Sequence, residues 1–256
     1  MSEVVAPKLA VLIDSDNVSY TYVKPMLEEI ARYGTPTIKR IYGDWTQPES
    51  AGWKNVLLEN AITPIQQYRY TSGKNCTDST LIIDAMDILY TERVSGFCIV
   101  SSDSDFTRLA TRLREAGMMV IGIGEEKTPS PFIAACDRFI FLEIIAPKSE
   151  PEEEKRKPEP QQLRRRKVPK EIRQLVRSSV NDVADEDGWA FLGDVGNMIL
   201  RKYPAFDSRA WGYSKLTSFI KALGMFEIDK RDTSNRGIKH IYIRDVNFSQ
   251  SDSKEN

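Results

Sequence analysis

The chain has 256 residues, of which 41% are hydrophobic and 29% charged, and its formal net charge is −1. This composition is ordinary for a globular protein and leaves room for one large domain or two smaller ones. No apolar run reaches the ~18 residues that a transmembrane helix needs, and the first residues lack the pattern of a signal peptide. We therefore expect a cytoplasmic protein with no membrane partner.

Cysteine and histidine usage excludes several classes of chemistry. The cysteines Cys76, Cys98 and Cys136 have no CxxC spacing, so neither a disulfide framework nor a zinc site is indicated. The single histidine, His240, lies in an alternating apolar run that is typical of a strand. A Ser-His-Asp triad or an HExxH site needs histidine at the reaction centre. Any catalysis must therefore depend on carboxylates, and a hard divalent metal is the natural partner.

A change in composition divides the chain in two. The segment Pro147–Pro169 is rich in proline and charge and almost free of apolar residues, which predicts a flexible linker. Acidic residues are in excess over residues 1–146, and basic residues are in excess over residues 147–256. The predicted parts are a first domain over 1–146, a charged linker over 147–167, a second domain over 168–245 and a disordered tail over 246–256.

Strand and helix signals alternate along the first domain. Short apolar runs predict buried strands at Lys8–Ile13, Pro36–Tyr42, Ile62–Tyr68, Phe97–Val100, Met119–Ile123 and Phe139–Leu142. Helical spacing predicts helices at Val18–Tyr33, Ala51–Asn60, Asp78–Tyr90 and Phe106–Ala116. This alternation predicts an α/β fold with a doubly wound parallel sheet that is covered by helices.

Aspartates gather where two of the predicted strands end. The stretch LIDSDN closes the first strand with Asp14, Asp16 and Asn17, and IVSSDSDF closes the fourth with Asp103 and Asp105. Open α/β sheets bind ligands beyond the carboxyl ends of strands, where the strand order reverses. If the first and fourth strands are neighbours, as in the common doubly wound order, both groups face one crevice.

A third acidic group comes from the helix that begins at Asp78. On that helix Asp84 and Asp87 lie one turn apart on one side, whereas Asp78 and Asp84 are about 240° apart and do not point straight at one spot. Helix capping is an alternative role for Asp78, and we interpret Asp87 as a solvated position. Carboxylates without histidine are typical of Mg²⁺ or Mn²⁺ sites, which activate water and neutralise phosphate charge.

Three blocks in the first domain resemble a known family. LAVLIDSDN, GKNCTDSTLIIDAMD and FCIVSSDSDF occur in the order of the signature blocks of NYN domains, the LabA-like branch of the PIN-like nuclease superfamily. The resemblance spans about Lys8 to Ile145 and implies a PIN-like, Rossmann-like sheet. It also implies metal-dependent ribonuclease chemistry, with Mg²⁺ or Mn²⁺ as cofactor and RNA as substrate.

The resemblance implies roles for individual residues. The catalytic set that it implies is Asp14, Asp78, Asp103 and Asp105, with Asn17 as a polar partner. The same four aspartates are the implied metal ligands, and Asp84 is an accessory ligand candidate. Many members have Ser-Gly-Asp in the third block where this chain has Ser101-Ser102-Asp103. Losing that glycine alters how closely the backbone approaches a substrate but removes no metal ligand.

The second domain has a resemblance of its own, to the OST-HTH (LOTUS) domain, which is a winged-helix module, over Val168–Asp245. The features that carry it are a helix near Lys170–Ala184, the turn DGWAFLGDVGNMI and the amphipathic helix in YSKLTSFIKALGMFEI. A two-stranded wing is predicted over Phe226–Ile228 and Ile238–Arg244. The whole chain is thus expected to be a doubly wound α/β domain followed by a small winged-helix domain.

Basic residues beside an aromatic ring on this module suit backbone contact and base stacking, and they predict RNA binding. The candidates are Lys230, Arg231 and Arg236 at the wing tip, and Arg209, Tyr213, Lys215 and Lys221 at the helix. Lys74 in the second block and Arg164, Arg165 and Arg166 in the linker complete the set. The alternative is a merely solvated surface, and the winged helix is also open to a protein partner.

Three functions therefore stay open. The first is a metal-dependent ribonuclease whose winged helix binds RNA, and the second is a non-catalytic RNA-binding or scaffold protein on the same fold. The third is a phosphatase of the haloacid-dehalogenase type, because residues 14–18 match a DxDx[VT] nucleophile loop. Against the phosphatase, the later motifs of that family do not follow in order, and the winged helix has no place in it.

Overall fold

The computed structural model describes residues 6–47, 52–68, 76–91, 93–145, 166–232 and 239–248. The chain divides into two compact units, Met1–Glu152 and Glu153–Asn256, and each is considered by itself. The longest described helix has 15 residues, which is shorter than the ~20 that a bilayer requires.

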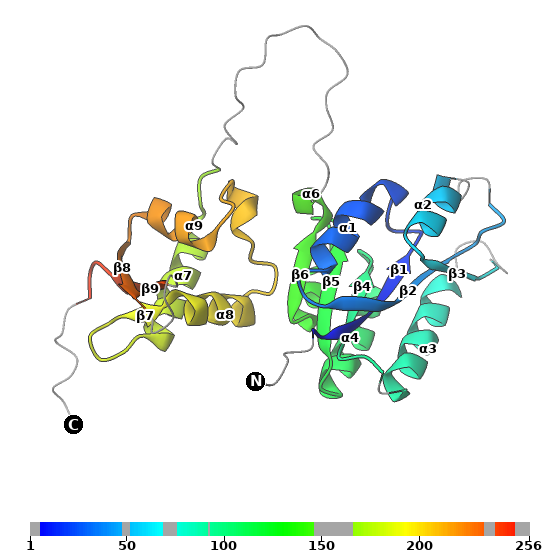
Figure 1. The fold of residues 1–256 in the computed structure, drawn as a ribbon, viewed down its shortest axis with the longest axis horizontal. Coiled ribbons are helices and arrows are strands. Elements are labelled where there is room, and N and C mark those ends of the chain that lie inside the picture. The colour runs from blue at the N-terminus through cyan, green and yellow to red at the C-terminus, as the bar shows by residue number, and fades with distance from the viewer. Residues whose placement is uncertain are drawn as a thin grey trace, which may run out of the picture. The chain divides into compact units, whose positions relative to one another are not determined.

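A six-stranded parallel sheet forms the centre of the first unit (Figure 1). Every neighbouring pair of its strands runs parallel. The order from one edge to the other is β3 (Thr63–Gln66), β2 (Thr35–Gly43), β1 (Lys8–Asp14), β4 (Gly96–Val100), β5 (Met119–Gly124) and β6 (Arg138–Phe141). The chain therefore reverses its direction of winding between β1 and β4, which confirms the doubly wound α/β fold.

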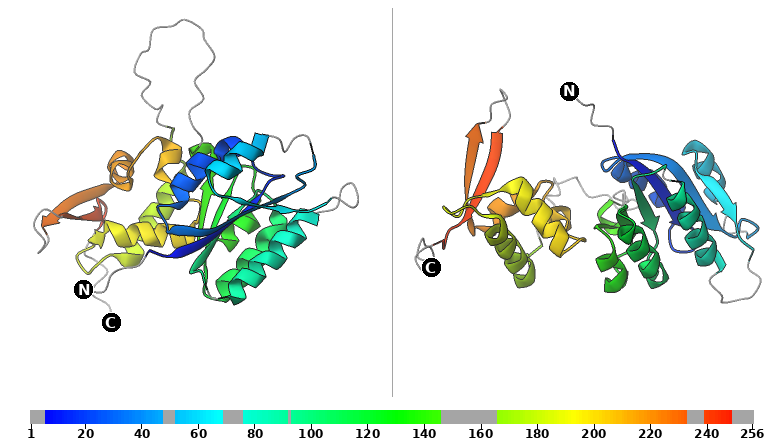
Figure 2. Two further views of the ribbon diagram at one scale, coloured as in Figure 1. Left: turned by 45° about the vertical axis from the view of Figure 1, so that its right-hand side comes forward. Right: turned by 90° about the horizontal axis from the view of Figure 1, so that it is seen from below.

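Helices cover both faces of this sheet (Figures 1 and 2). One face carries α1 (Val23–Ile30), α2 (Trp53–Glu59) and α6 (Leu142–Ile145), and the other carries α3 (Cys76–Tyr90) and α4 (Thr107–Glu115), with α5 (Ser130–Ala135) packed beside α4. Because both faces are covered, a central strand needs apolar side chains on both sides. The strand β1, KLAVLID, is accordingly buried at every position after Lys8.

Strand register sets where the polar side chains emerge. Ile13 of β1 pairs with Val100 of β4, so the residues that follow both strands lie side by side at the carboxyl edge of the sheet. The helix α3 contacts β1 and β2, and its first turn reaches the same edge because it runs opposite to the strands. This edge is where the sequence predicts the aspartates to meet.

The second unit is a small helical domain with a three-stranded antiparallel sheet in the order β7-β9-β8. Its elements are α7 (Lys170–Val183), β7 (Ala190–Phe191), α8 (Leu192–Lys202), α9 (Leu216–Leu223), β8 (Phe226–Asp232) and β9 (Lys239–Asp245). Its core includes Val176, Ile199, Phe219 and Ile243, all fully buried. The pair β8 and β9 forms the predicted wing.

Three predicted elements need correction. The helix expected over 18–33 is shorter, because a 3-10 turn, η1 (Tyr20–Tyr22), precedes α1. The segment DGWAFLGDVGNMI, predicted as a turn, includes the first eight residues of the 11-residue helix α8. The first wing strand extends to Asp232 rather than ending at Ile228, so Lys230 and Arg231 lie within β8 and not at a loop tip.

Candidate metal centre

Asp14 closes β1 and is completely buried. Its carboxylate accepts three hydrogen bonds: from the backbone N–H of Asp16 at 3.0 Å, from the Asn17 side-chain amide at 2.6 Å and from the Ser101 hydroxyl at 2.9 Å. Burial raises the pKa of Asp14, and the hydrogen bonds from Asn17 and Ser101 oppose that rise. The two strand ends are therefore tied together through this one side chain.

Three further carboxylates converge beside it. Asp78 lies in the first turn of α3, while Asp103 and Asp105 follow β4, and one oxygen of each lies within 4.8 Å of the others. Asp103 caps the 3-10 turn η3 (Ser104–Phe106) by accepting the N–H of Asp105 at 2.9 Å. The N–H of Asp103 is in turn bonded to the Ser101 hydroxyl at 3.1 Å.

The cluster of Asp78, Asp103 and Asp105 concentrates negative charge. Desolvation, together with repulsion from Asp14, Asp103 and Asp105, raises the pKa of Asp78 to about 6. Oxygen ligands held this closely are what a hard divalent cation such as Mg²⁺ or Mn²⁺ prefers, and a cation would relieve the repulsion. The donor set therefore fits a divalent metal. Asp14 lies outside this group of three, but its negative charge contributes to the raised pKa of Asp78.

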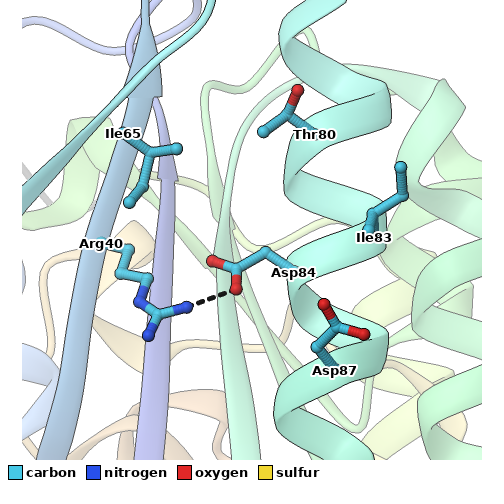
Figure 3. A pocket seen from close by; sticks show the side chains of 6 residues that line it. All are labelled: Arg40, Ile65, Thr80, Ile83, Asp84 and Asp87. Atoms are coloured by element: carbon cyan, nitrogen blue, oxygen red, sulfur yellow. Dashed lines mark hydrogen bonds and ion pairs between the residues drawn. The ribbon is translucent and has the colours of Figure 1, made fainter.

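Asp84 lies elsewhere on α3. Its carboxylate forms an ion pair with Arg40 and accepts a hydrogen bond from the Tyr42 hydroxyl, and both partners belong to β2. Figure 3 shows Asp84 turned toward Arg40, with Asp87 one turn further along the helix. An open pocket lies here, lined by Arg40, Ile65, Thr80, Ile83, Asp84 and Asp87. The structure thus separates Asp84 from the three clustered carboxylates, as its 240° offset from Asp78 requires.

Sequence reasoning did not single out the two serines that organise the site. Ser101 is fully buried and bridges Asp14 and the backbone of Asp103. The Ser102 hydroxyl accepts the N–H of Glu125 at 2.9 Å. The Ser102 hydroxyl thus fastens the loop after β4 to the end of β5. The signal available in the sequence for this role was the pair of serines directly after a buried strand.

A family model of the NYN domain matches residues 8–143, which is more than half of the chain. The chain belongs to the NYN domain family. The NYN domain is of the nuclease type found in the PIN-like superfamily, and all four candidate aspartates lie within the matched range. A model of the OST-HTH/LOTUS domain matches residues 164–238, so both resemblances seen in the sequence are confirmed.

Solved structures also resemble parts of this NYN protein. A protein of unknown function from Vibrio parahaemolyticus is 21% identical, with a TM-score of 0.45, and the match covers 54% of this chain and 94% of the other. An uncharacterised protein from Nitrosomonas europaea is 32% identical with a TM-score of 0.28, covering 38% and 87%. A protein fragment from Chromobacterium violaceum is 28% identical with a TM-score of 0.25, covering 30% and 83%. No curated protein matches significantly.

The structure places the candidate RNA-binding residues of the OST-HTH domain in different settings. Lys215 and Lys221 are exposed at the start and near the end of α9, and Tyr213 packs edge-on against Phe219. Arg209 is engaged in an ion pair with Asp207 at 2.6 Å. Lys221 and Lys215 are thus the better-presented cations of this helix.

The wing carries a stack of arginine and aromatic side chains. The Arg231 guanidinium lies 4.0 Å from the Tyr242 ring centroid and 5.3 Å from that of Trp189, and it is paired with Asp229. Lys230, its neighbour on β8, is exposed. Arg166 is exposed before α7, whereas Lys74, Arg164, Arg165 and Arg236 lie outside the described residues.

Proposed function

We propose that this protein is a metal-dependent ribonuclease that uses Mg²⁺ or Mn²⁺ and binds RNA through its OST-HTH domain. The observation that carries the proposal is the meeting of Asp78, Asp103 and Asp105 beside buried Asp14, at the carboxyl edge of an NYN sheet. Carboxylates alone repel a phosphodiester, so a crowded acidic site has a use in RNA chemistry only when it holds a cation.

In the proposed mechanism the chain's own groups divide the work. Asp78, Asp103 and Asp105 would hold a divalent ion, and Asp14 would be either a further ligand or the group that accepts a proton from water. Asn17 and Ser101 keep the Asp14 carboxylate in one orientation through their hydrogen bonds. A bound divalent ion supplies an activated water and neutralises charge on the scissile phosphate. Asp84 is a structural residue in this scheme because it is already paired with Arg40.

The OST-HTH domain is proposed to hold RNA for the NYN domain. Exposed Lys215, Lys221 and Lys230 supply phosphate contacts, and Arg166 adds to them from just before the module. We retain the proposed division into an NYN domain over 1–146, a linker over 147–167 and a winged-helix domain over 168–245. A non-catalytic RNA-binding protein on the same fold would show the binding without the cleavage.

Incubation of the purified protein with labelled single-stranded RNA, with and without Mn²⁺, tests the proposal. Wild type should cleave only when metal is added. Asp103→Asn should reduce cleavage by roughly a hundredfold, because it removes one proposed metal ligand. Asp87→Asn is the matched control, because Asp87 is an exposed carboxylate of α3 outside the cluster. Binding of RNA with no cleavage in any metal would favour the scaffold instead.

A further inference from the structure

We propose that Tyr20 forms a stacking shelf for one base of the RNA substrate, beside the carboxylate cluster. The inference rests on the proposed function and adds a substrate-positioning residue to it. Tyr20 opens η1, which follows the Asp14–Asn17 loop in the sequence. The residue is 43% exposed, although its ring contacts Trp53 and Gly52.

The Tyr20 ring is held by neighbours rather than free to swing. It meets Trp53 edge to face, with centroids 6.2 Å apart and planes at 72°, and Trp53 is itself buried. Trp45 supports Trp53 from another direction at 6.4 Å. The ring also packs close to Gly52, where an added Cβ atom would come within 2.7 Å of Tyr20 Cε1. A glycine is required there for the ring to keep this position.

These aromatics occupy the same edge of the sheet as the carboxylates. Asp14 pairs in register with Tyr42, so the loops after β1 and β2 emerge together. They also touch, because the N–H of Ser15 donates to the carbonyl of Tyr42 at 3.1 Å. Trp45 follows β2 directly, and its indole N–H is bonded to the Ile65 carbonyl at 3.0 Å. Tyr20 thus follows the same strand as Asp14, and Trp45 follows the neighbouring strand at the same edge of the sheet.

A half-exposed ring held in place at the same edge of the sheet as the proposed metal centre suits a nucleobase. Every base has a π face, so stacking tolerates any sequence and positions the backbone without reading it. A base that stacks on Tyr20 would hold its phosphate at a set distance from Asp78, Asp103 and Asp105. Stacking needs no positive charge on the protein, so it can hold a base at an edge of the sheet that also carries carboxylates.

Two substitutions separate stacking from other roles of Tyr20. In single-turnover cleavage of labelled RNA with Mn²⁺, Tyr20→Ala should raise the KM roughly 5- to 150-fold, which is the range for losing one stacked base. Tyr20→Phe should stay within about twofold, because it keeps the ring. Gly52→Ala should act like a weaker Tyr20→Ala, since the added methyl displaces the ring. Tyr90→Ala is the control: Tyr90 is 72% exposed at the far end of α3. Circular dichroism and melting temperatures verify that each variant is folded.

An abasic walk gives the decisive measurement. One abasic nucleotide is moved along the RNA. When it stands at one fixed distance from the cleaved bond, cleavage by wild type should weaken by a factor comparable to the effect of Tyr20→Ala. In Tyr20→Ala, an abasic nucleotide at that position should cause no further loss of cleavage. Equal penalties in both proteins at every position, or identical behaviour of Tyr20→Ala and Tyr90→Ala, would overturn the shelf. If wild type cuts no RNA, the proposed nuclease function fails, and the same comparison of Kd values with Ca²⁺ present still decides whether Tyr20 stacks on RNA.

Discussion

At the scale of single residues, repulsion within the cluster of Asp78, Asp103 and Asp105 should lower the stability of the fold, although the same charges are proposed to bind the metal ion. Each pair of like charges a few Å apart costs on the order of 1 kcal/mol in a partly shielded site. Asp103→Asn relieves this repulsion while keeping the shape of the side chain. In chelator the variant should therefore melt at a higher temperature than wild type, and it should gain less from Mn²⁺.

Thermal melts of both proteins in chelator and in Mn²⁺ check this prediction. Metal at a hundred times its dissociation constant should stabilise wild type by roughly 2.7 kcal/mol. A loop aspartate with a purely structural role gives the reverse pattern, because Asp103 also caps η3. A lower melting temperature of the variant in chelator, together with an unchanged response to metal, would count against a metal centre.

The pH dependence of stability follows from Asp78. Its pKa is about 6 in the folded protein, against an ordinary value of 3.8, so between these limits the folded state holds a proton that the unfolded state has lost. The Asp78 contribution to the free energy of unfolding thus falls as the pH rises from 4 to 6, and the penalty is complete above 6. In chelator, moving from pH 7 to pH 5 should raise the melting temperature of wild type more than that of Asp78→Asn.

Protons and metal compete for the same carboxylate. Since Asp78 must lose its proton to bind a cation, Mn²⁺ affinity should weaken roughly tenfold between pH 7 and pH 5. Isothermal titration at the two pH values measures this, and the proton released on binding is detected by comparing buffers of different ionisation enthalpy. Equal Mn²⁺ affinity at both values would show that Asp78 is not a ligand.

Asp84 allows a test in which the substitution should lower the stability of the fold, whereas Asp103→Asn should raise it in chelator. It is mostly buried and satisfies both Arg40 and the buried hydroxyl of Tyr42. Asp84→Asn weakens both contacts, so the free energy of unfolding should fall by about 1–3 kcal/mol. The stabilisation by Mn²⁺ should stay as in wild type, and Asp87→Asn should change neither quantity. A lost metal response in Asp84→Asn would restore Asp84 as an accessory ligand.

At the scale of elements, α9 presents the cations of the OST-HTH domain. Lys215 and Lys221 are exposed and lie outside the ion pairs seen at Arg209 and Arg231. Replacing either lysine by alanine should weaken RNA binding for all sequences alike and lower the slope of log Kd against log salt by about 1. Lys170→Ala at the start of α7 is the matched control. Fluorescence anisotropy at several salt concentrations gives the slopes.

The central strands β1, β4 and β5 of the NYN domain were predictable because they are short apolar runs buried at nearly every position. Their neighbours were predictable too, since the doubly wound order brings β1 beside β4. Helix α8 was missed because its glycines look like turn signals. A Cβ at Gly193 would come within 2.6 Å of the Phe191 ring, so this glycine permits close packing rather than a turn. Such a requirement comes from tertiary contact and is invisible in local sequence.

The candidate site was predictable only in part, because some of its contacts depend on residues that are far apart in the sequence. Asp78, Asp103 and Asp105 follow from strand ends and a helix start, and the structure brings them together. The partner of Asp84 could not be read from the sequence, because Arg40 lies 44 positions away and meets it only after the sheet has formed. The burial of Asp14 beneath Ser101 likewise depends on the pairing of β1 with β4.

At the scale of the whole molecule, the two units have separate cores, and their functions should be separable. We expect residues 1–152 to retain Mn²⁺-dependent cleavage of short RNA with a raised KM. Residues 153–256 should bind RNA without cutting it, and binding by the full chain should weaken as salt rises. Cleavage assays and salt titrations on the two fragments and the full chain test this. A second fragment that binds no RNA at low salt would point to a protein partner instead.

The serines after β4 have a consequence for which ions the molecule accepts. Ser101 bonds to Asp14 and to the backbone of Asp103, and Ser102 bonds to the strand beyond, so the loop has little freedom to widen. Mg²⁺ binds oxygen at 2.0–2.1 Å and Ca²⁺ at 2.3–2.6 Å. If the cluster binds a cation, a loop fastened on both sides should favour the smaller Mg²⁺ over Ca²⁺, and Ser102 would then affect the choice of ion through the position of the loop.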